Sequence, residues 1–105
     1  MNTIPVLSAE ELGVLADTFK LLGDPTRLKI LLYCLQEPKA VSNIAETLAL
    51  SQPLTSHHLR LLRAARLVKS ERQSRQVFYT VADNHVADML KDMASHIGEE
   101  RHGKK

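Results

Sequence analysis

The most informative pattern in this chain is the segment Leu50-Ser51-Gln52-Pro53-Leu54-Thr55-Ser56-His57-His58-Leu59-Arg60-Leu61-Leu62. Ser51 is a residue type that caps helix N-termini, and Pro53 is tolerated in a first turn, where backbone N–H groups have no partner within the helix. Thr55, Leu59 and Leu62 then recur at the spacing of one helix face. The pattern predicts a helix over residues 52–65 that packs this face against a core.

A shorter helix is predicted just before it, from about Ser42 to Leu48, with Ile44, Ala45 and Leu48 as its apolar face. Two helices joined by a turn of three or four residues form a helix-turn-helix, whose second helix enters the DNA major groove. Gln suits adenine and Arg suits guanine or phosphate. His58 lies nearer the core side and is expected to be packed rather than to bind a ligand. The candidate DNA-binding residues on the polar face are Gln52, Ser56, His57, Arg60 and Arg63.

After this helix, the helical spacing of apolar residues gives way to a pattern typical of β-strands. Residues 67–71 and 76–81 are rich in Val, Phe, Tyr and Thr, and the polar segment Arg72–Arg75 separates them, which predicts a β-hairpin with a basic tip. Residues 60–75 carry a charge of +5, whereas the rest of the chain is near neutral or acidic. This distribution indicates a local nucleic-acid contact that includes Arg72 and Arg75, and the alternative is a solvated charged surface.

Local signals place three more helices. Ser8 and Glu11 form a capping box before a helix over 9–22, and Asp24 with Pro25 begins a helix that stops before Pro38. Asp83 is the expected cap of a last helix from about 84 to 98. We therefore expect a mainly α fold with a β-hairpin wing (α+β), a winged helix-turn-helix in one domain of residues 1–105. Residues 1–8 and 100–105 are expected to be flexible.

The composition narrows the class of protein. Hydrophobic residues make up 44% of the chain and aromatic residues 4%, which predicts an aliphatic core. A single cysteine, Cys34, excludes a disulfide framework and a two-thiol metal site. Because neither a signal segment nor a membrane-spanning run is visible, we expect a cytoplasmic protein without a membrane partner. We see no nucleophile paired with a base and no Gly-rich phosphate loop, so we do not expect an enzyme.

Four zinc-type ligands lie on the last helix in two pairs, Asp83 with His85 and His96 with Glu99. The two histidines are 11 residues apart, so they share a face but are about 16 Å apart along the axis. One ion, with ligand bonds of about 2 Å, cannot be held by both pairs of one chain. A shared site therefore requires a second, antiparallel chain, which predicts a symmetric homodimer.

Beside these ligands, an apolar stripe is expected to pack against the same stripe of the partner. Its members are Val86, Met89, Leu90, Met93 and Ile97. The alternative is that both histidines are surface residues beside a dimer interface. His102 is a possible additional ligand, and a fifth or sixth ligand would favour nickel or cobalt over zinc.

Three segments carry a resemblance to a known family: residues 22–31 (LGDPTRLKIL), residues 50–62, and the wing from Arg72 to Tyr79. Over roughly residues 12–99 the chain resembles the ArsR/SmtB family of winged helix-turn-helix metalloregulatory repressors. The resemblance implies a homodimer paired through its first and last helices that releases double-stranded operator DNA when an effector binds. Two positions depart from the family pattern: Thr55, where an apolar residue is usual, and Ser74, where Gly is common.

The family senses effectors at different sites. One subgroup uses two cysteines near the start of the third helix, and this chain has none between Val41 and Leu48. Another uses the last helix, with the pattern Asp-x-His, ten residues, His, two residues, and Glu or His. The match at every position implies a zinc sensor. Its four matching residues are Asp83, His85, His96 and Glu99.

The expected function is a transcriptional repressor whose metal-free dimer binds an operator and whose DNA affinity falls when zinc binds. Cobalt or nickel could replace zinc as the regulatory ion. Two further alternatives remain open: a DNA-binding regulator of the same fold without metal sensing, and a winged-helix adaptor that binds proteins.

Overall fold

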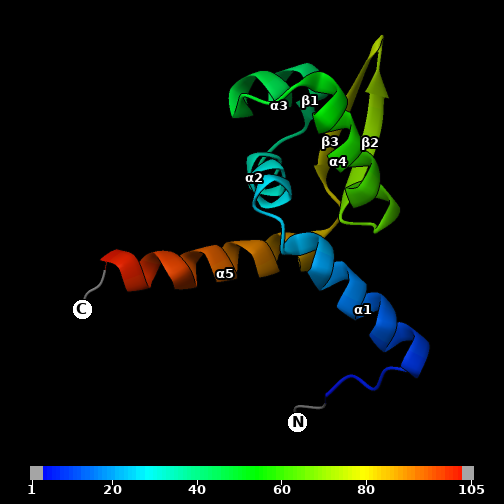
Figure 1. Cartoon of the computed structure of the whole chain (residues 1–105), viewed down its shortest axis with the longest axis vertical. Coiled ribbons are helices and arrows are strands. Elements are labelled where there is room, and N and C mark those ends of the chain that lie inside the picture. Colours follow the sequence, from blue (N-terminus) through cyan, green and yellow to red (C-terminus); the bar gives the residue numbers. More distant parts are fainter. Residues whose placement is uncertain (1–3, 103–105) are drawn as a thin grey trace.

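The chain folds into five helices and a small sheet (Figure 1). The computed structural model describes residues 4–102, and side chains for residues 4–99. The elements in chain order are α1 (Ala9–Leu22), α2 (Pro25–Tyr33), β1 (Lys39–Ala40), α3 (Val41–Leu48), α4 (Gln52–Ala64), β2 (Val68–Gln73), β3 (Gln76–Val81) and α5 (Asn84–His102). The predicted fold class, mainly α with a β-hairpin wing, is confirmed.

The first two helices begin where their capping residues predict. The Ser8 hydroxyl accepts a hydrogen bond from the backbone N–H of Glu11 at 3.0 Å, and the Glu11 carboxylate accepts one from the backbone N–H of Ser8 at 2.9 Å. Asp24 caps α2, with Pro25 at its first position. The α2 helix ends at Tyr33, which is earlier than expected. Residues 34–38 lead out of the helix ahead of Pro38, whose ring disfavours helical backbone at the preceding residue.

The helix-turn-helix is formed by α3 and α4. Between them, Ala49 ends α3 with φ 59°, in the left-handed region that usually favours glycine, and Ser51 caps α4. The backbone N–H of Leu50 donates to the Ala45 carbonyl at 2.8 Å, which stabilises this turn. The three-residue connection therefore agrees with the predicted turn length.

The sheet has one strand that the pattern analysis missed. Its order is β1-β3-β2, all antiparallel, because β1 pairs with β3 through Lys39 opposite Tyr79 and Ala40 opposite Phe78. A two-residue strand has no detectable period, so only its pairing with β3 reveals it. The strand closes the sheet next to the start of α3 and joins the wing to the helical part.

A mostly aliphatic core joins α2, α3, α4 and the base of the wing. The residues with less than 2% exposure are Ile30, Leu31, Cys34, Ile44, Thr55, Leu59 and Leu62. The Thr55 hydroxyl lies in this core and donates to the Ser51 carbonyl at 2.8 Å, so the polar substitution leaves no buried group unpaired. Leu90 on α5 is the member of the core that anchors the last helix.

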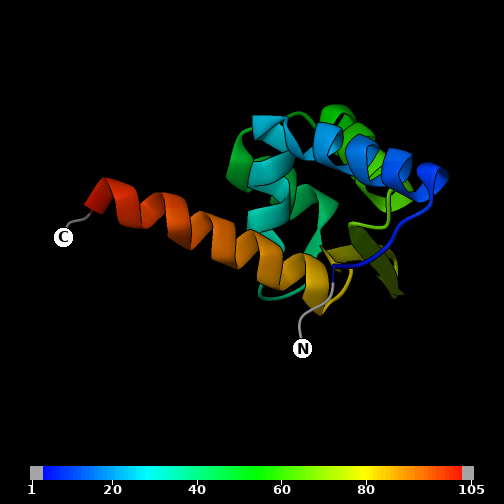
Figure 2. The same ribbon diagram turned by 90° about the horizontal axis from the view of Figure 1, so that it is seen from below.

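The two outer helices extend away from this core. Figure 2 shows α5 projecting to one side while α1 lies toward the other. Both helices leave large apolar side chains exposed, among them Phe19 on α1 and Ile97 on α5. The α5 helix continues through Gly98 to His102, four residues beyond the predicted end. A glycine in a helix interior lowers stability by about 1 kcal/mol relative to alanine. This cost is small enough for a long helix such as α5 to continue through Gly98. Residues 4–7 precede α1 without regular secondary structure and are exposed, and the flexibility predicted for both ends stays a prediction.

Candidate nucleic-acid interface and metal ligands

Helix α4 presents a polar face because its other side is buried. The buried side consists of Thr55, His58, Leu59 and Leu62. The Ser51 hydroxyl accepts from the backbone N–H of Leu54 at 3.2 Å and thereby fixes where the helix begins. Because Pro53 has no N–H and the N–H groups of Leu54 and Thr55 are bonded to Ser51, side chains rather than backbone groups supply most of the hydrogen-bonding capacity at this end of α4.

The predicted DNA-binding residues of α4 lie on the accessible side of the helix. Ser56 is half-buried, and the others are exposed: Gln52, His57, Arg60 and Arg63. Leu54 was missed by the polar pattern. It lies in the first turn with 43% of its surface exposed, and an apolar side chain there can contact a thymine methyl group.

The wing is a tight hairpin whose tip differs from the predicted one. Strand β2 continues to Gln73, so Arg72 lies within the strand, opposite Val77, and only Ser74 and Arg75 form the turn. Ser74 adopts φ 61°, the left-handed conformation for which glycine is preferred. Both arginines are exposed, and Arg75 is at the tip as predicted.

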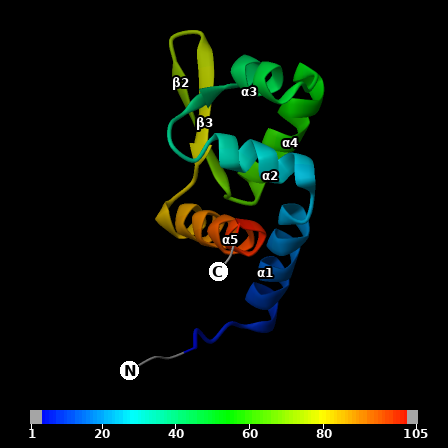
Figure 3. The same cartoon turned by 90° about the vertical axis from the view of Figure 1, so that its left-hand side faces the viewer.

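The wing and the helix-turn-helix lie at one end of the molecule. Figure 3 shows α3, α4 and the tip of the hairpin together, opposite α1 and α5. The fold thus places α4 and the hairpin tip where a duplex could contact both at once, whereas Arg66 of the basic segment lies beside α1 and lines a pocket with Asp17. Neither Arg72 nor Arg75 has a carboxylate partner within the described part of the chain.

His58 is packed, as predicted. It is 8% exposed, and its Nδ1 accepts a hydrogen bond from Arg27 Nη1 at 3.3 Å. Burial lowers the pKa of His58 below its ordinary value, because the interior disfavours the charged imidazolium. His58 is therefore part of the structural core of the helix-turn-helix.

The four predicted metal ligands lie on α5 or directly before it, and all are exposed. Asp83 caps the helix, since its Oδ1 accepts from the backbone N–H of Val86 at 3.0 Å. The second carboxylate oxygen, Oδ2, remains available to a ligand. Within residues 4–99, no three potential ligands of one chain gather closely enough to hold an ion. The pairs Asp83–His85 and His96–Glu99 therefore stay apart in one protomer.

The apolar stripe of α5 is divided between two roles, which corrects the prediction that all of it faces a partner. Leu90 is 5% exposed and belongs to the core of its own chain, and Val86 and Met89 pack against that core. Met93 and Ile97 are 50% and 62% exposed. They line an apolar groove of about 370 Å³ together with Leu28, Leu32 and Ala94.

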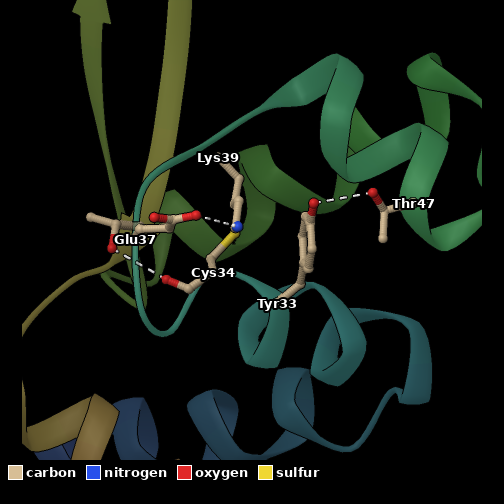
Figure 4. Close-up of polar contacts among 6 residues, drawn as sticks. Tyr33, Cys34, Glu37, Lys39 and Thr47 are labelled. Atoms are coloured by element: carbon tan, nitrogen blue, oxygen red, sulfur yellow. Dashed lines mark hydrogen bonds and ion pairs between the residues drawn. The ribbon is translucent and has the colours of Figure 1, made fainter.

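Cys34 lies in a cluster on the other side of α2 (Figure 4). Lys39 Nζ donates to Glu37 at 2.9 Å and lies 4.6 Å from the centre of the Tyr33 ring, whose hydroxyl is 3.1 Å from Thr47 Oγ1. These contacts connect α2, β1 and α3. Burial raises the pKa of the Cys34 thiol to about 11, so it is protonated at neutral pH and unsuited to bind a metal.

The side chain of His102, the possible additional ligand, lies outside those that the structure describes. No helix in the described range 4–102 is both long enough and apolar enough to cross a membrane.

Comparisons with known proteins agree with this arrangement. Residues 24–70 match the family described as bacterial regulatory protein, arsR family. The chain is 36% identical over 94 residues to a transcriptional repressor SmtB homolog of Synechocystis sp., covering 90% of this chain and 71% of the relative. It is 33% identical over 82 residues to a cadmium resistance transcriptional regulatory protein CadC homolog of Staphylococcus aureus, covering 77% and 68%.

The fold also matches a solved structure over its whole length. A homodimeric winged helix-turn-helix DNA-binding domain from Mycobacterium bovis, described as a possible ArsR-family transcriptional regulator, superposes with a TM-score of 0.85 at 26% identity. The match covers 100% of this chain and 99% of that one. On the family match and the identity to relatives that are covered over two thirds or more of their length, the chain belongs to the ArsR family of bacterial regulatory proteins, which are transcriptional regulators and not enzymes.

Proposed function

We propose that this protein is a metal-responsive transcriptional repressor: its metal-free homodimer binds operator DNA, and zinc binding between the last helices lowers that affinity. The observation that carries the proposal is the exposed α5 with two separated ligand pairs, neither of which can complete a site alone. The relatives named as a repressor and as a cadmium resistance regulator support the same class of function.

The arrangement of α3, α4 and the wing at one end of the molecule supports operator binding. The accessible side of α4 and the wing offer hydrogen-bonding groups for base edges and cations for phosphates. The groups proposed to contact DNA are Gln52, Ser56, His57, Arg60, Arg63, Arg72 and Arg75. A dimer would present two such faces, so a site with two inverted half-sites is expected.

Dimer formation is supported by the apolar side chains that α1 and α5 leave uncovered. On α1, Leu12, Val14 and Phe19 are each more than half exposed, at 57%, 62% and 57%. On α5, Met93 and Ile97 line the apolar groove beside α2. Apolar patches of this kind, exposed on two helices, are typical of protein–protein interfaces. The solved relative from Mycobacterium bovis is described as homodimeric.

The donor set fits a zinc site. Two imidazoles and two carboxylates make four N/O ligands, which zinc accepts in tetrahedral geometry. Asp83 can act as both cap and ligand because the cap uses only Oδ1. An antiparallel partner helix would bring its His96 and Glu99 to Asp83 and His85 of the first chain, and the two-fold axis makes a second equal site. A metal ion bound there would link the last helices of two protomers.

Regulation follows from differential affinity. The metal lowers operator affinity only if the dimer conformation that binds metal best differs from the one that binds DNA best. DNA must then weaken metal binding by the same factor, and couplings of about 1–3 kcal/mol, or about 5–150-fold, are typical. We propose that His96 transmits the effect, because its second ring nitrogen can hold a backbone carbonyl once the ring is fixed.

A metal titration of the dimer on its operator tests the proposal. Chelator-treated protein is bound to a labelled duplex, and zinc, cobalt and nickel are added separately while anisotropy is recorded. Zinc is expected to release the DNA at one ion per chain. Cobalt or nickel acting at lower free concentration would instead assign the regulatory ion to them, and unchanged affinity with every metal would leave a regulator without metal sensing.

Two variants separate the DNA face from the metal site. His96→Ala should bind the operator like the wild type and should not release it with zinc. Arg60→Ala should bind the operator more weakly while it still binds one zinc per chain. Loss of DNA binding in His96→Ala would show that His96 has a structural role.

A further inference from the structure

Arg27, on α2, contacts the end of α1 and the buried side of α4, the helix proposed to recognise DNA. Its Nε donates to the carbonyl of Leu21 in the last turn of α1 at 2.9 Å, and its backbone N–H donates to Asp24 Oδ2 at 3.0 Å. Its Nη1 donates to Nδ1 of His58 on α4 at 3.3 Å. One guanidinium therefore ties the end of α1 to the recognition helix, and a rigid planar donor fork can hold both acceptors at once.

The contact requires a neutral His58. Arginine has donors only, so Nδ1 of His58 must be the acceptor and Nε2 must carry the ring proton. Burial, followed in importance by the neighbouring charges, sets the pKa of His58: burial, Arg27 and His57 lower it, and Asp24 opposes them. Two further charged residues, both on α1, line the same shallow pocket as Arg27: Asp17 and Lys20.

Protonation of His58 removes this hydrogen bond. The imidazolium has an N–H on both nitrogens and cannot accept from Arg27, and two cations would face each other at 3.3 Å in a half-buried site. Asp24 caps the start of α2 and lies outside α1, so a contact between protonated His58 and Asp24 would not restore the link that runs from α4 through Arg27 to Leu21. The link between α1 and α4 is therefore present only while His58 is neutral.

We propose that the Arg27–His58 contact holds the recognition helix in its DNA-binding orientation, and that protonation of His58 in mild acid releases the contact and weakens operator binding. The inference rests on the proposed role of α4 in DNA binding. His58 is 8% exposed on the core side of α4, so it is a positioning residue and does not touch DNA. Since α1 also carries the exposed apolar face proposed for dimer contact, Arg27 provides a direct connection from the subunit interface to the recognition helix.

The test measures operator affinity against pH without metal. A duplex selected by this protein from random-sequence DNA is titrated by anisotropy from pH 7.5 to 5.5 at constant salt with a chelator. The measurements use a His57→Gln background, so that His58 is the only histidine of α4 that differs between the two proteins compared. The comparison is with His57→Gln/His58→Gln, whose side-chain amide oxygen can still accept from Arg27 but does not titrate.

The background protein is expected to lose operator affinity as the pH falls. If the pKa of His58 is one unit lower in the DNA complex than in the free protein, the loss is about tenfold per protomer. The His58→Gln protein is expected to match it at pH 7.5 and to lose less affinity at pH 5.5. The two proteins differ only at residue 58, so the ratio of their affinities isolates the effect of His58. Identical pH profiles for the two proteins would overturn the inference, whereas absence of operator binding at every pH would count against the proposed function.

A measurement on DNA-free wild-type protein keeps the inference testable if a variant does not fold. Imidazole ¹⁵N NMR is expected to show His58 with Nδ1 unprotonated and Nε2 protonated at pH 7.5. Below pH 6.5, its titration should shift the amide signals of both α4 and the last turn of α1. A proton on Nδ1 at pH 7.5, or a titration that leaves the α1 amides unchanged, would contradict the proposal.

Discussion

Replacing the two wing arginines tests how much of the DNA affinity comes from the phosphate backbone. In the variant Arg72→Gln/Arg75→Gln, each chain loses two exposed cations that have no carboxylate partner in the described residues. The hairpin itself should persist, because Arg72 pairs with Val77 through backbone groups and Ser74 retains the left-handed turn position. The expected change is therefore electrostatic.

The magnitude follows from the number of charges. With four arginines at the proposed interface of each protomer (60, 63, 72 and 75), a dimer presents eight, and each phosphate neutralised contributes about −0.9 to the slope of log affinity against log salt. The wild type should show a slope of about −7, and the variant, with four charges fewer, about −3.6. Raising the salt from about 50 to 200 mM should weaken the wild type by about four decades and the variant by about two.

The assay is fluorescence anisotropy with the selected duplex at four or more salt concentrations. Lys29→Gln is the matched control, since Lys29 is an exposed cation on α2, away from the proposed interface. The control should keep the wild-type slope. A slope that is unchanged in the wing variant, or lowered equally by Lys29→Gln, would refute the placement of the wing on the DNA backbone.

Leu90→Ala should lower the free energy of unfolding by about 2–5 kcal/mol in urea denaturation at fixed protein concentration, because Leu90 anchors α5 in the core; a loss below about 1 kcal/mol would mean that α5 is held elsewhere. The thiol of Cys34 has its pKa raised from 9.0 to about 11, so its contribution to stability is present below pH 9 and is lost as the pH rises toward the folded value. At pH 10.5 the wild type should have lost about 2 kcal/mol more than Cys34→Ala, relative to pH 8, in the same denaturation experiment, and equal losses would contradict the assignment. Thr55→Val should change the free energy of unfolding by less than about 1 kcal/mol, because the Ser51 carbonyl still accepts the backbone N–H of residue 55 at 3.0 Å; a larger loss would show that the hydroxyl has a further role.

Helix starts were predictable because the signals that set them are local. Ser8, Asp24, Ser51 and Asp83 each hydrogen-bond to a backbone N–H three residues later, within one turn of chain. The helix-turn-helix and the hairpin followed in the same way, from spacing and turn residues alone. Ends were less certain: α2 stops at Tyr33 and α5 continues past Gly98, since neither end is set by a single residue type.

For the candidate sites, too, local patterns predicted some features and only the packing of the helices decided others. Exposure of the metal-binding residues on α5 and of most DNA-contacting residues on α4 followed from helical periodicity, although Ser56 is half-buried. The division of the apolar stripe of α5 between core and surface could not be predicted from periodicity, because Val86, Leu90 and Ile97 are equivalent in the sequence pattern. Only their place relative to α2 and β3 separates the residues that fill the core from those that remain exposed.

The sequence by itself determined the helix-turn-helix, the basic wing and the paired ligands of the last helix, because capping, periodicity and charge act within a few residues. The tertiary structure decided what requires segments distant in the chain to meet. It paired β1 with β3, assigned Leu90 to the core, and placed Arg27 against His58, 31 residues further along. Such contacts depend on how helices pack, and no local pattern encodes the distance between two side chains that only packing brings together.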